Sequence, residues 1–223
     1  MFFLLVKMTR MYTLNKAYFI SFEGIDGSGK STQAKLLIEK LTSKSIETCF
    51  VREPGGTEIA EEVRSVLLSN RDEEMSRRTE ALLMCACRAQ LTRNIIIPEL
   101  KSGKWVIADR YSDSTLAYQG GGRGINTDWL IELNEFATFS TLPDITFYID
   151  VGESTGLQRR KNNSADRIEG AGLQFQRAIR EKYLEIIDNF SDRCVLVDGN
   201  LSIDAISDII WKEIRIRTSI END

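Results

Sequence analysis

Apolar positions along the chain follow two patterns, short continuous runs and longer stretches with helical spacing. The short runs predict strands of a parallel sheet, because such strands are buried on both faces and lack polar alternation. The predicted strands are Tyr18–Phe22, Thr48–Arg52, Trp105–Asp109, Thr146–Asp150 and Val195–Asp198. Helical pattern separates each run from the next, so we expect helices on both faces of a five-stranded sheet, a three-layer α/β fold.

The stretches between these runs carry apolar side chains three and four residues apart, as on the buried face of a helix. The first two show this spacing at Ala34, Leu37, Ile38 and Leu41, and at Ile59, Val63, Val66 and Leu67. Further helices are predicted over Thr79–Pro98, Thr127–Phe139, Glu153–Lys161, Leu173–Phe190 and Ile203–Arg217.

The length of 223 residues suits one domain with a sizeable core. Regular patterning begins near residue 17 and ends near residue 217. We therefore expect a single domain over residues 17–217, with residues 1–16 as an N-terminal extension outside the core and residues 218–223 as a C-terminal tail.

The charge and the apolar content of the chain limit the classes of partner that the protein can bind. The net charge of −4 leaves no general basic surface, so polymeric DNA or RNA is not an expected partner. The opening MFFLLVK has an apolar run shorter than a signal-peptide core, and no stretch approaches the ~20 residues that span a bilayer. Four cysteines without a C-x-x-C pair fit reduced thiols. We expect a cytoplasmic protein that does not bind membranes.

The chain contains no histidine. Its absence excludes a Ser-His-Asp triad, a histidine-ligated metal and a histidine general base. Phosphoryl transfer remains open, because its transition state depends on cations and alignment more than on covalent help from the protein.

The segment from Phe19 to Thr32 reads FISFEGIDGSGKST, an apolar strand that leads through a glycine-rich turn into a helix. It matches G-x-x-x-x-G-K-[ST] in the context that distinguishes a phosphate-binding loop from a structural turn. The backbone N–H groups and Lys30 are predicted to bind a nucleoside triphosphate, and Ser31 to hold Mg²⁺. The predicted triphosphate-binding residues are Gly24, Ile25, Asp26, Gly27, Ser28, Gly29, Lys30, Ser31 and Thr32.

Polar side chains follow the strand that ends in WVIAD. In open α/β sheets, ligands bind beyond the carboxyl ends of the strands. Asp109 can orient Mg²⁺ or its waters there, and Arg110 offers a planar fork for a phosphate. An ordinary surface pair of these two side chains is the alternative. Lys30 and Arg110 are the first catalytic candidates.

A basic segment from Leu157 to Leu173 reads LQRRKNNSADRIEGAGL. We expect a lid at about residues 157–173, because loops that close over a nucleotide exclude water and bring cations to the transferring phosphoryl group. Its catalytic candidates are Arg159, Arg160 and Arg167. A solvated basic helix end is the alternative, and the sequence does not single out one arginine.

Several strings together resemble bacterial thymidylate kinases, a family of P-loop nucleoside monophosphate kinases: EGIDGSGKSTQ, REPGGTEIAEEVRSVLL, DRYSDSTLAYQGGGRGI, LPDITFYIDV and DRIE. The match covers nearly everything from Tyr18 onward, and REPGGT and DRY-x-x-S-x-x-AYQG are far more specific than a phosphate loop. The resemblance implies the P-loop NTPase fold and transfer of a phosphoryl group from ATP to dTMP with Mg²⁺, which gives ADP and dTDP for dTTP synthesis. It also implies a homodimer.

The resemblance also implies roles at the acceptor. Asp26 would hold the 3′-hydroxyl of dTMP, while Arg64 and Arg110 would grip its phosphate. Arg88 would donate to thymine O4, and the Tyr118 ring would crowd a ribose 2′-hydroxyl. The expected dTMP-binding set is Asp26, Glu53, Pro54, Arg64, Met84, Arg88, Arg110, Ser114, Thr115, Tyr118 and Gln119, and the expected Mg²⁺ residues are Ser31 and Asp109.

Met84 departs from the family pattern, which usually places a phenylalanine four residues before Arg88 to stack on thymine. The spacing keeps both side chains on one helix face, and a thioether can still lie against an aromatic ring. An ordinary core methionine is the alternative.

Two other functions stay open. A kinase for another nucleotide or nucleoside is disfavoured by Arg88, Tyr118 and Gln119, which resemble residues that select thymidylate. A non-catalytic P-loop regulator that selects guanine would need an N-K-x-D motif, and Asn15-Lys16 precedes the first strand and lacks the Asp.

Overall fold

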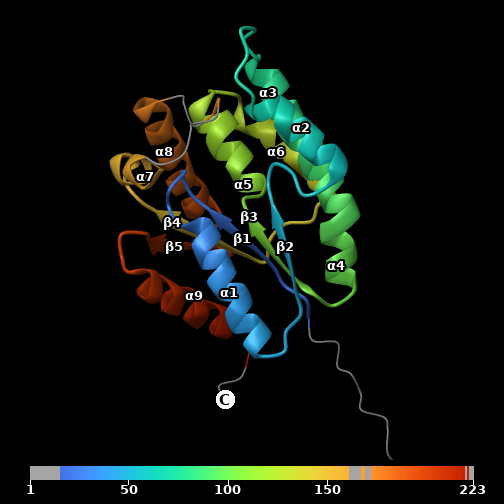
Figure 1. The fold of residues 1–223 in the computed structure, drawn as a ribbon, viewed down its shortest axis with the longest axis vertical. Helices are drawn as coiled ribbons and strands as arrows, with labels where there is room; N and C mark the ends of the chain where they lie inside the picture. Colours follow the sequence, from blue (N-terminus) through green and yellow to red (C-terminus); the bar gives the residue numbers. More distant parts are fainter. Residues whose placement is uncertain (1–15, 161–166, 169–171, 219, 221–223) are drawn as a thin grey trace, which may run out of the picture.

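A computed structural model of the chain describes residues 16–160, 167–168, 172–218 and 220. Its centre is a five-stranded parallel sheet with the order β2-β3-β1-β4-β5 (Figure 1). The strands are β1 (Phe19–Glu23), β2 (Thr48–Arg52), β3 (Trp105–Asp109), β4 (Ile145–Asp150) and β5 (Cys194–Asp198). The sheet expected from the sequence is confirmed, with strand ends shifted by at most one residue.

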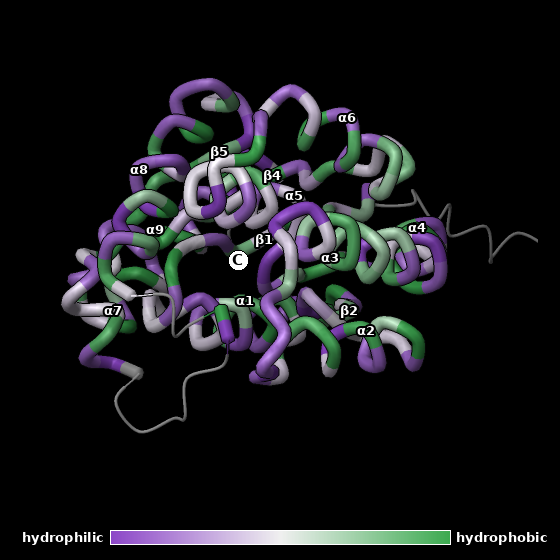
Figure 2. Tube along the Cα trace, turned by 90° about the horizontal axis from the view of Figure 1, so that it is seen from above, coloured by the Kyte–Doolittle hydropathy of each residue, from purple (hydrophilic) through white to green (hydrophobic). Residues whose placement is uncertain are grey.

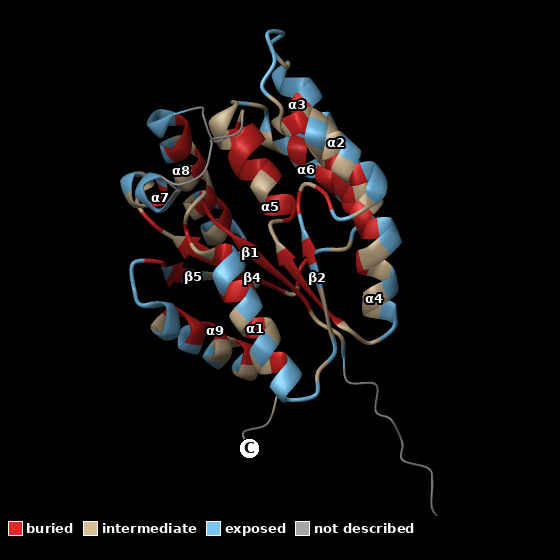
Figure 3. Ribbon diagram, in the orientation of Figure 1, coloured by how far each residue is buried: buried red, intermediate tan, exposed pale blue. Residues whose placement is uncertain are grey.

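Helices form a layer on each side of the sheet, as predicted (Figures 1 and 2). On one side α1 and α9 pack against Ile20 and Phe22 of β1, whereas Phe19, which precedes Ile20, packs on the other side, near Leu91 of α3. Both faces of the strands are therefore buried (Figure 3). The helical elements, with η marking π-helical turns, are α1 (Lys30–Ser43), α2 (Glu58–Leu68), α3 (Arg77–Leu91), η1 (Thr92–Ile96), α4 (Ile97–Lys101), α5 (Ser112–Thr115), η2 (Leu116–Gly122), α6 (Thr127–Thr138), α7 (Glu153–Arg160), α8 (Leu173–Asn189) and α9 (Ile203–Thr218).

One predicted helix is longer than expected. The stretch Thr79–Pro98 begins at Arg77, where the Ser76 hydroxyl caps it, and continues through η1 and α4 to Lys101. Pro98 does not end it, because Pro98 lies in the first turn of α4, where a missing N–H costs little.

The segment formed by α5 and η2 has no counterpart among the predicted helices. Its apolar periodicity is weak because polar side chains face the interior, among them Asp113, Thr115 and Gln119. Such burial is stable only with partners, and Asp113 forms an ion pair with Arg193 at 2.7 Å. This segment forms one wall of the site described below.

α7 packs closely on the phosphate loop through a glycine. A Cβ on Gly156 would lie 2.7 Å from the carbonyl oxygen of Asp26, which is closer than real Cβ contacts. The first part of the predicted lid is therefore a helix seated on the loop. Residues 161–166 and 169–171 of that segment lie outside the described residues.

The described chain starts and ends near the amino ends of the strands, at the opposite end of the sheet from the phosphate loop (Figure 1). Lys16 forms an ion pair with Asp144, just before β4, and Arg217 of α9 donates to the carbonyl of Asp192, just before β5. Residues 1–15 and most of the predicted tail lie outside the described residues, so the domain boundaries stay a prediction. The cysteines are free, and no described helix has the length and apolar character needed to cross a bilayer.

Candidate active site

The turn after β1 is followed by α1 in the arrangement that the glycine-rich pattern predicts. Gly29 precedes α1 with φ of 103°, a conformation that residues with a Cβ rarely adopt. The loop lines a pocket into which the N-terminus of α1 opens, and this end of a helix favours anions. The lining residues are Asp26, Gly27, Ser28, Gly29, Lys30, Ser31, Thr32, Gln33, Asp109, Arg110, Arg159, Gly199, Leu201, Ile203 and Ile206.

Gly24 and Ile25 belong to the predicted triphosphate-binding set but do not line this pocket. The Gly24 carbonyl accepts a hydrogen bond from Arg110 at 2.9 Å, and the Ile25 carbonyl accepts one from Lys30 at 2.9 Å. Through these bonds the two residues position the positively charged side chains of Arg110 and Lys30, which line the pocket.

Lys30 is only 6% exposed. Burial, reinforced by the positive charge of Arg110, lowers the pKa of its ammonium group to about 8. The bond to the Ile25 carbonyl holds this group at the floor of the loop, where an anionic ligand would stabilise its charged form.

Ser31 and Asp109 meet across the pocket, because the Ser31 hydroxyl donates to the Asp109 carboxylate. The pair joins the start of α1 to the end of β3. Hydroxyl and carboxylate oxygens are ligands that Mg²⁺ prefers, and Mg²⁺ takes few of them from protein. The two residues predicted for the metal therefore form a chemically suitable pair.

The three lid arginines lie in different places. Arg159 lines the phosphate pocket and donates twice to the Gly199 carbonyl, each at 3.1 Å. Arg167 instead forms an ion pair with Glu80 at 2.7 Å and donates to the Leu67 carbonyl, so the structure does not bring it to the phosphate loop. The side chain of Arg160 lies outside the described residues.

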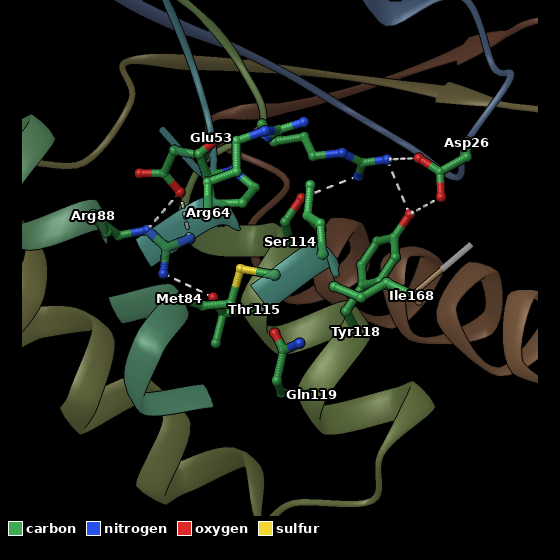
Figure 4. Close-up of a pocket in the computed structure, with 13 residues that line it drawn as sticks. Asp26, Glu53, Arg64, Met84, Arg88, Ser114, Thr115, Tyr118, Gln119 and Ile168 are labelled. Atoms are coloured by element: carbon green, nitrogen blue, oxygen red, sulfur yellow. Dashed lines mark hydrogen bonds and ion pairs between the residues drawn. The ribbon is translucent and has the colours of Figure 1, made fainter. Parts of the chain in front are cut away.

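A second pocket adjoins the first (Figure 4). Every residue of the predicted acceptor set lines it, from the loop after β1 to η2. Sequence reasoning missed two further apolar lining residues, Leu68 of α2 and Ile168. Ile168 belongs to the DRIE string, but its side chain gave no chemical signal.

The two pockets share Asp26 and Arg110. Arg110 donates to the Asp26 carboxylate and, at 2.9 Å, to the Tyr118 hydroxyl, which in turn donates to Asp26 at 3.1 Å. Burial raises the pKa of Tyr118 well above its ordinary value, so the phenol stays protonated. A ligand phosphate in either pocket would therefore lie beside the same guanidinium group.

Comparison with known proteins identifies the family. Residues 22–210 match the family model for thymidylate kinase. The thymidylate kinase of Kosmotoga olearia is 45% identical over 196 residues, 87% of this chain and 94% of that protein. That of Fervidobacterium nodosum is 47% identical over 188 residues, 84% of this chain and 93% of that protein. The chain belongs to the thymidylate kinase family.

In this member of the thymidylate kinase family, a buried carboxylate, Glu23, lies behind Arg110, the arginine that the two pockets share. Sequence reasoning gave Glu23 no role. Glu23 accepts hydrogen bonds from the Tyr111 backbone N–H at 2.7 Å, from Ser114 at 2.6 Å and from Tyr183 at 2.8 Å. Burial, together with the nearby Asp113, raises its pKa to about 7. These bonds fix the turn in which Arg110 adopts a left-handed φ of 72°.

Arg88, which the family resemblance assigns to thymine O4, is 2% exposed and has an acceptor for each of its five N–H groups. The acceptors are Glu53, Tyr111, Thr115 and Asn134. Donation to a base would thus share or replace one of these bonds. The other oxygen of Glu53, Oε1, is buried without a hydrogen-bond partner in the described part of the chain, which leaves one acceptor of this pocket-lining residue unused.

The lowered pKa of Lys30 leads to a prediction about proton uptake. Above pH 8, the free protein holds Lys30 largely neutral, whereas a bound triphosphate favours the charged form. ATP binding should therefore take up a proton, and its affinity should fall by up to about tenfold per pH unit above pH 8. Calorimetric titrations at pH 8.5 to 9, in buffers with different ionisation enthalpies, measure this uptake. Lys30→Arg, which does not titrate, should lose it, and equal heats for the wild type in all buffers would refute the prediction.

Proposed function

We propose that the protein catalyses transfer of the terminal phosphoryl group of ATP to dTMP, which produces dTDP for dTTP synthesis. The observation that carries this proposal is the pair of adjoining pockets that share Asp26 and Arg110. A triphosphate on the loop and a monophosphate in the second pocket would meet at that junction. Membership of the thymidylate kinase family supports the choice of substrates.

On the donor side, the loop amides and Lys30 would bind the ATP phosphates. Ser31 and Asp109 would hold Mg²⁺, which supplies charge neutralisation to the phosphate oxygens. Their oxygen chemistry and their mutual contact support this assignment. Arg159, which already lines the pocket, is the lid arginine best placed to add charge.

On the acceptor side, Arg64 and Arg110 would hold the dTMP phosphate. Arg64 lines the pocket and donates to the Pro54 carbonyl at 2.6 Å. An oxygen of this phosphate would attack the terminal phosphorus of ATP in line, and no general base is needed because the phosphate is already largely dianionic near neutral pH. Arg110 would screen the repulsion between donor and acceptor.

A homodimer and a cytoplasmic location complete the proposal. α2, α3 and α6 lie side by side (Figure 1) and expose large apolar side chains: Ile59 on α2, Leu82 on α3 and Phe136 on α6. Phe136 is 83% exposed, and exposed apolar groups on neighbouring helices are typical of an interface between copies. Free cysteines fit a reducing compartment.

The activity is tested with Lys30→Ala. Loss of the buried ammonium group should lower kcat/KM by orders of magnitude while the circular dichroism spectrum is retained. Lys35→Ala, at an exposed position of the same helix, is the matched control and should keep wild-type activity. A coupled ADP assay over dTMP, dUMP, UMP, dCMP and thymidine identifies the acceptor. ATP binding without transfer to any of them would favour a regulatory role instead.

Met84 provides a test of base contact, because it lines the acceptor pocket with Arg88 (Figure 4). Met84→Phe should lower KM for dTMP by a few-fold, since an aromatic ring stacks on thymine more tightly than a thioether does. KM for ATP serves as the internal control and should not change. A KM for dTMP that stays the same or rises would argue against contact between Met84 and the base.

The dimer is tested with Phe136→Lys. A charge in an apolar interface should shift the protein from dimer to monomer in sedimentation velocity runs. Leu196→Lys, on the exposed side of the edge strand β5, is the control and should leave the sedimentation coefficient unchanged. A wild-type monomer at micromolar concentration would refute the homodimer.

A further inference from the structure

The Glu80 carboxylate, in the first turn of α3, lies behind the acceptor pocket and is 1% exposed. It accepts hydrogen bonds from Gln119 Nε2 at 2.8 Å and from Arg123 Nε and Nη2 at 3.0 and 3.1 Å, and it pairs with Arg167 at 2.7 Å. Burial alone would raise the pKa of Glu80, but the hydrogen bonds from Arg123 and Gln119 more than offset it and lower the pKa. Glu80 is therefore ionised, and an ionised carboxylate only accepts hydrogen bonds.

This contact settles which way the Gln119 amide points. Because Glu80 cannot donate, the amide must turn its NH₂ group toward Glu80, which leaves Oε1 on the other side. Gln119 lines the acceptor pocket, and Figure 4 shows its amide directed toward Thr115 and Met84. No hydrogen bond reaches Gln119 Oε1 from the residues that the structure describes. The pocket thus presents a fixed, unused acceptor.

We propose that Glu80 is a positioning residue that sets the base preference of the acceptor site by locking Gln119 with its carbonyl oxygen toward the base. The inference rests on the proposed function. Thymine and uracil carry an N3–H donor that such an oxygen accepts. Cytosine has an acceptor at N3, so two lone pairs would face each other. Glu80 thereby selects pyrimidine monophosphates with a donor at N3 and rejects those with an acceptor there.

A purely structural role is the alternative, since the same carboxylate also holds Arg123 and Arg167. Loss of that role would weaken all pyrimidine monophosphates alike. Only the orientation role predicts a change in the relative affinity of the site for two different bases. The measured quantity is therefore the Ki of 5-methyl-dCMP, as a competitor, divided by the KM of dTMP. The two compounds share the methyl group, the sugar and the phosphate.

Glu80→Gln is the central variant. Its amide can donate as well as accept, so Gln119 becomes free to rotate and offer NH₂ to the base. The ratio of Ki to KM should fall about tenfold, the effect of one mismatched hydrogen bond in a buried site. Arg167→Gln is the matched control, because it removes an ion pair from the same carboxylate and leaves the Gln119 contact in place. The control should keep the wild-type ratio even if its turnover changes.

The exchange of the two side chains, Glu80→Gln with Gln119→Glu, keeps the charge and the hydrogen bond between them. The carboxylate introduced at position 119 again offers an acceptor to the base, so the ratio should return most of the way to wild type. This variant also carries the test if Glu80→Gln alone does not fold. An unchanged ratio in Glu80→Gln, or a low ratio in the exchange variant, would overturn the inference. Absence of dTMP phosphorylation by the wild type would instead overturn the proposed function.

Discussion

The ion pair between Asp26 and Arg110 ties the phosphate loop to the end of β3, and both pockets are arranged around it. The side chain of Arg110 is 14% exposed and that of Asp26 is 18% exposed, so salt screens their attraction less than it would at an open surface. Glu23 supports the pair from behind by binding the backbone N–H that follows Arg110. Two phosphate-bearing ligands repel each other, and this arrangement places one fixed cation, the Arg110 guanidinium, next to both of their binding pockets.

Other buried charged side chains in the site also lie against partners of opposite charge. Arg88 and Glu53 form an ion pair at 2.5 Å with both side chains almost completely buried, and Glu80 gathers Gln119 and two arginines. Desolvation makes such groups costly unless every donor has an acceptor. The pocket walls are therefore largely set before any ligand arrives, which reduces the reorganisation that binding and catalysis would otherwise require.

Local pattern predicts the strands and the phosphate loop, because each depends on residues that are close in sequence. The residues of the acceptor pocket were predicted from the resemblance to a known family, because they are far apart in the sequence and come together only when the chain folds. Pattern failed at α5 and η2, where buried polar groups break the apolar periodicity that marks a helix. It also gave no sign of the ion pair between Arg167 and Glu80, because the two residues are far apart in the sequence and no local signal connects them.

The positions where the described chain begins and ends have a practical meaning. Lys16 enters beside Asp144, and α9 ends beside Asp192, both at the amino ends of strands. The pockets open at the carboxyl ends, a full strand length away. A surface-attachment tag or a fluorescent fusion joined near either point would thus leave the nucleotide entrance unobstructed, so immobilised protein would suit ligand-binding sensors.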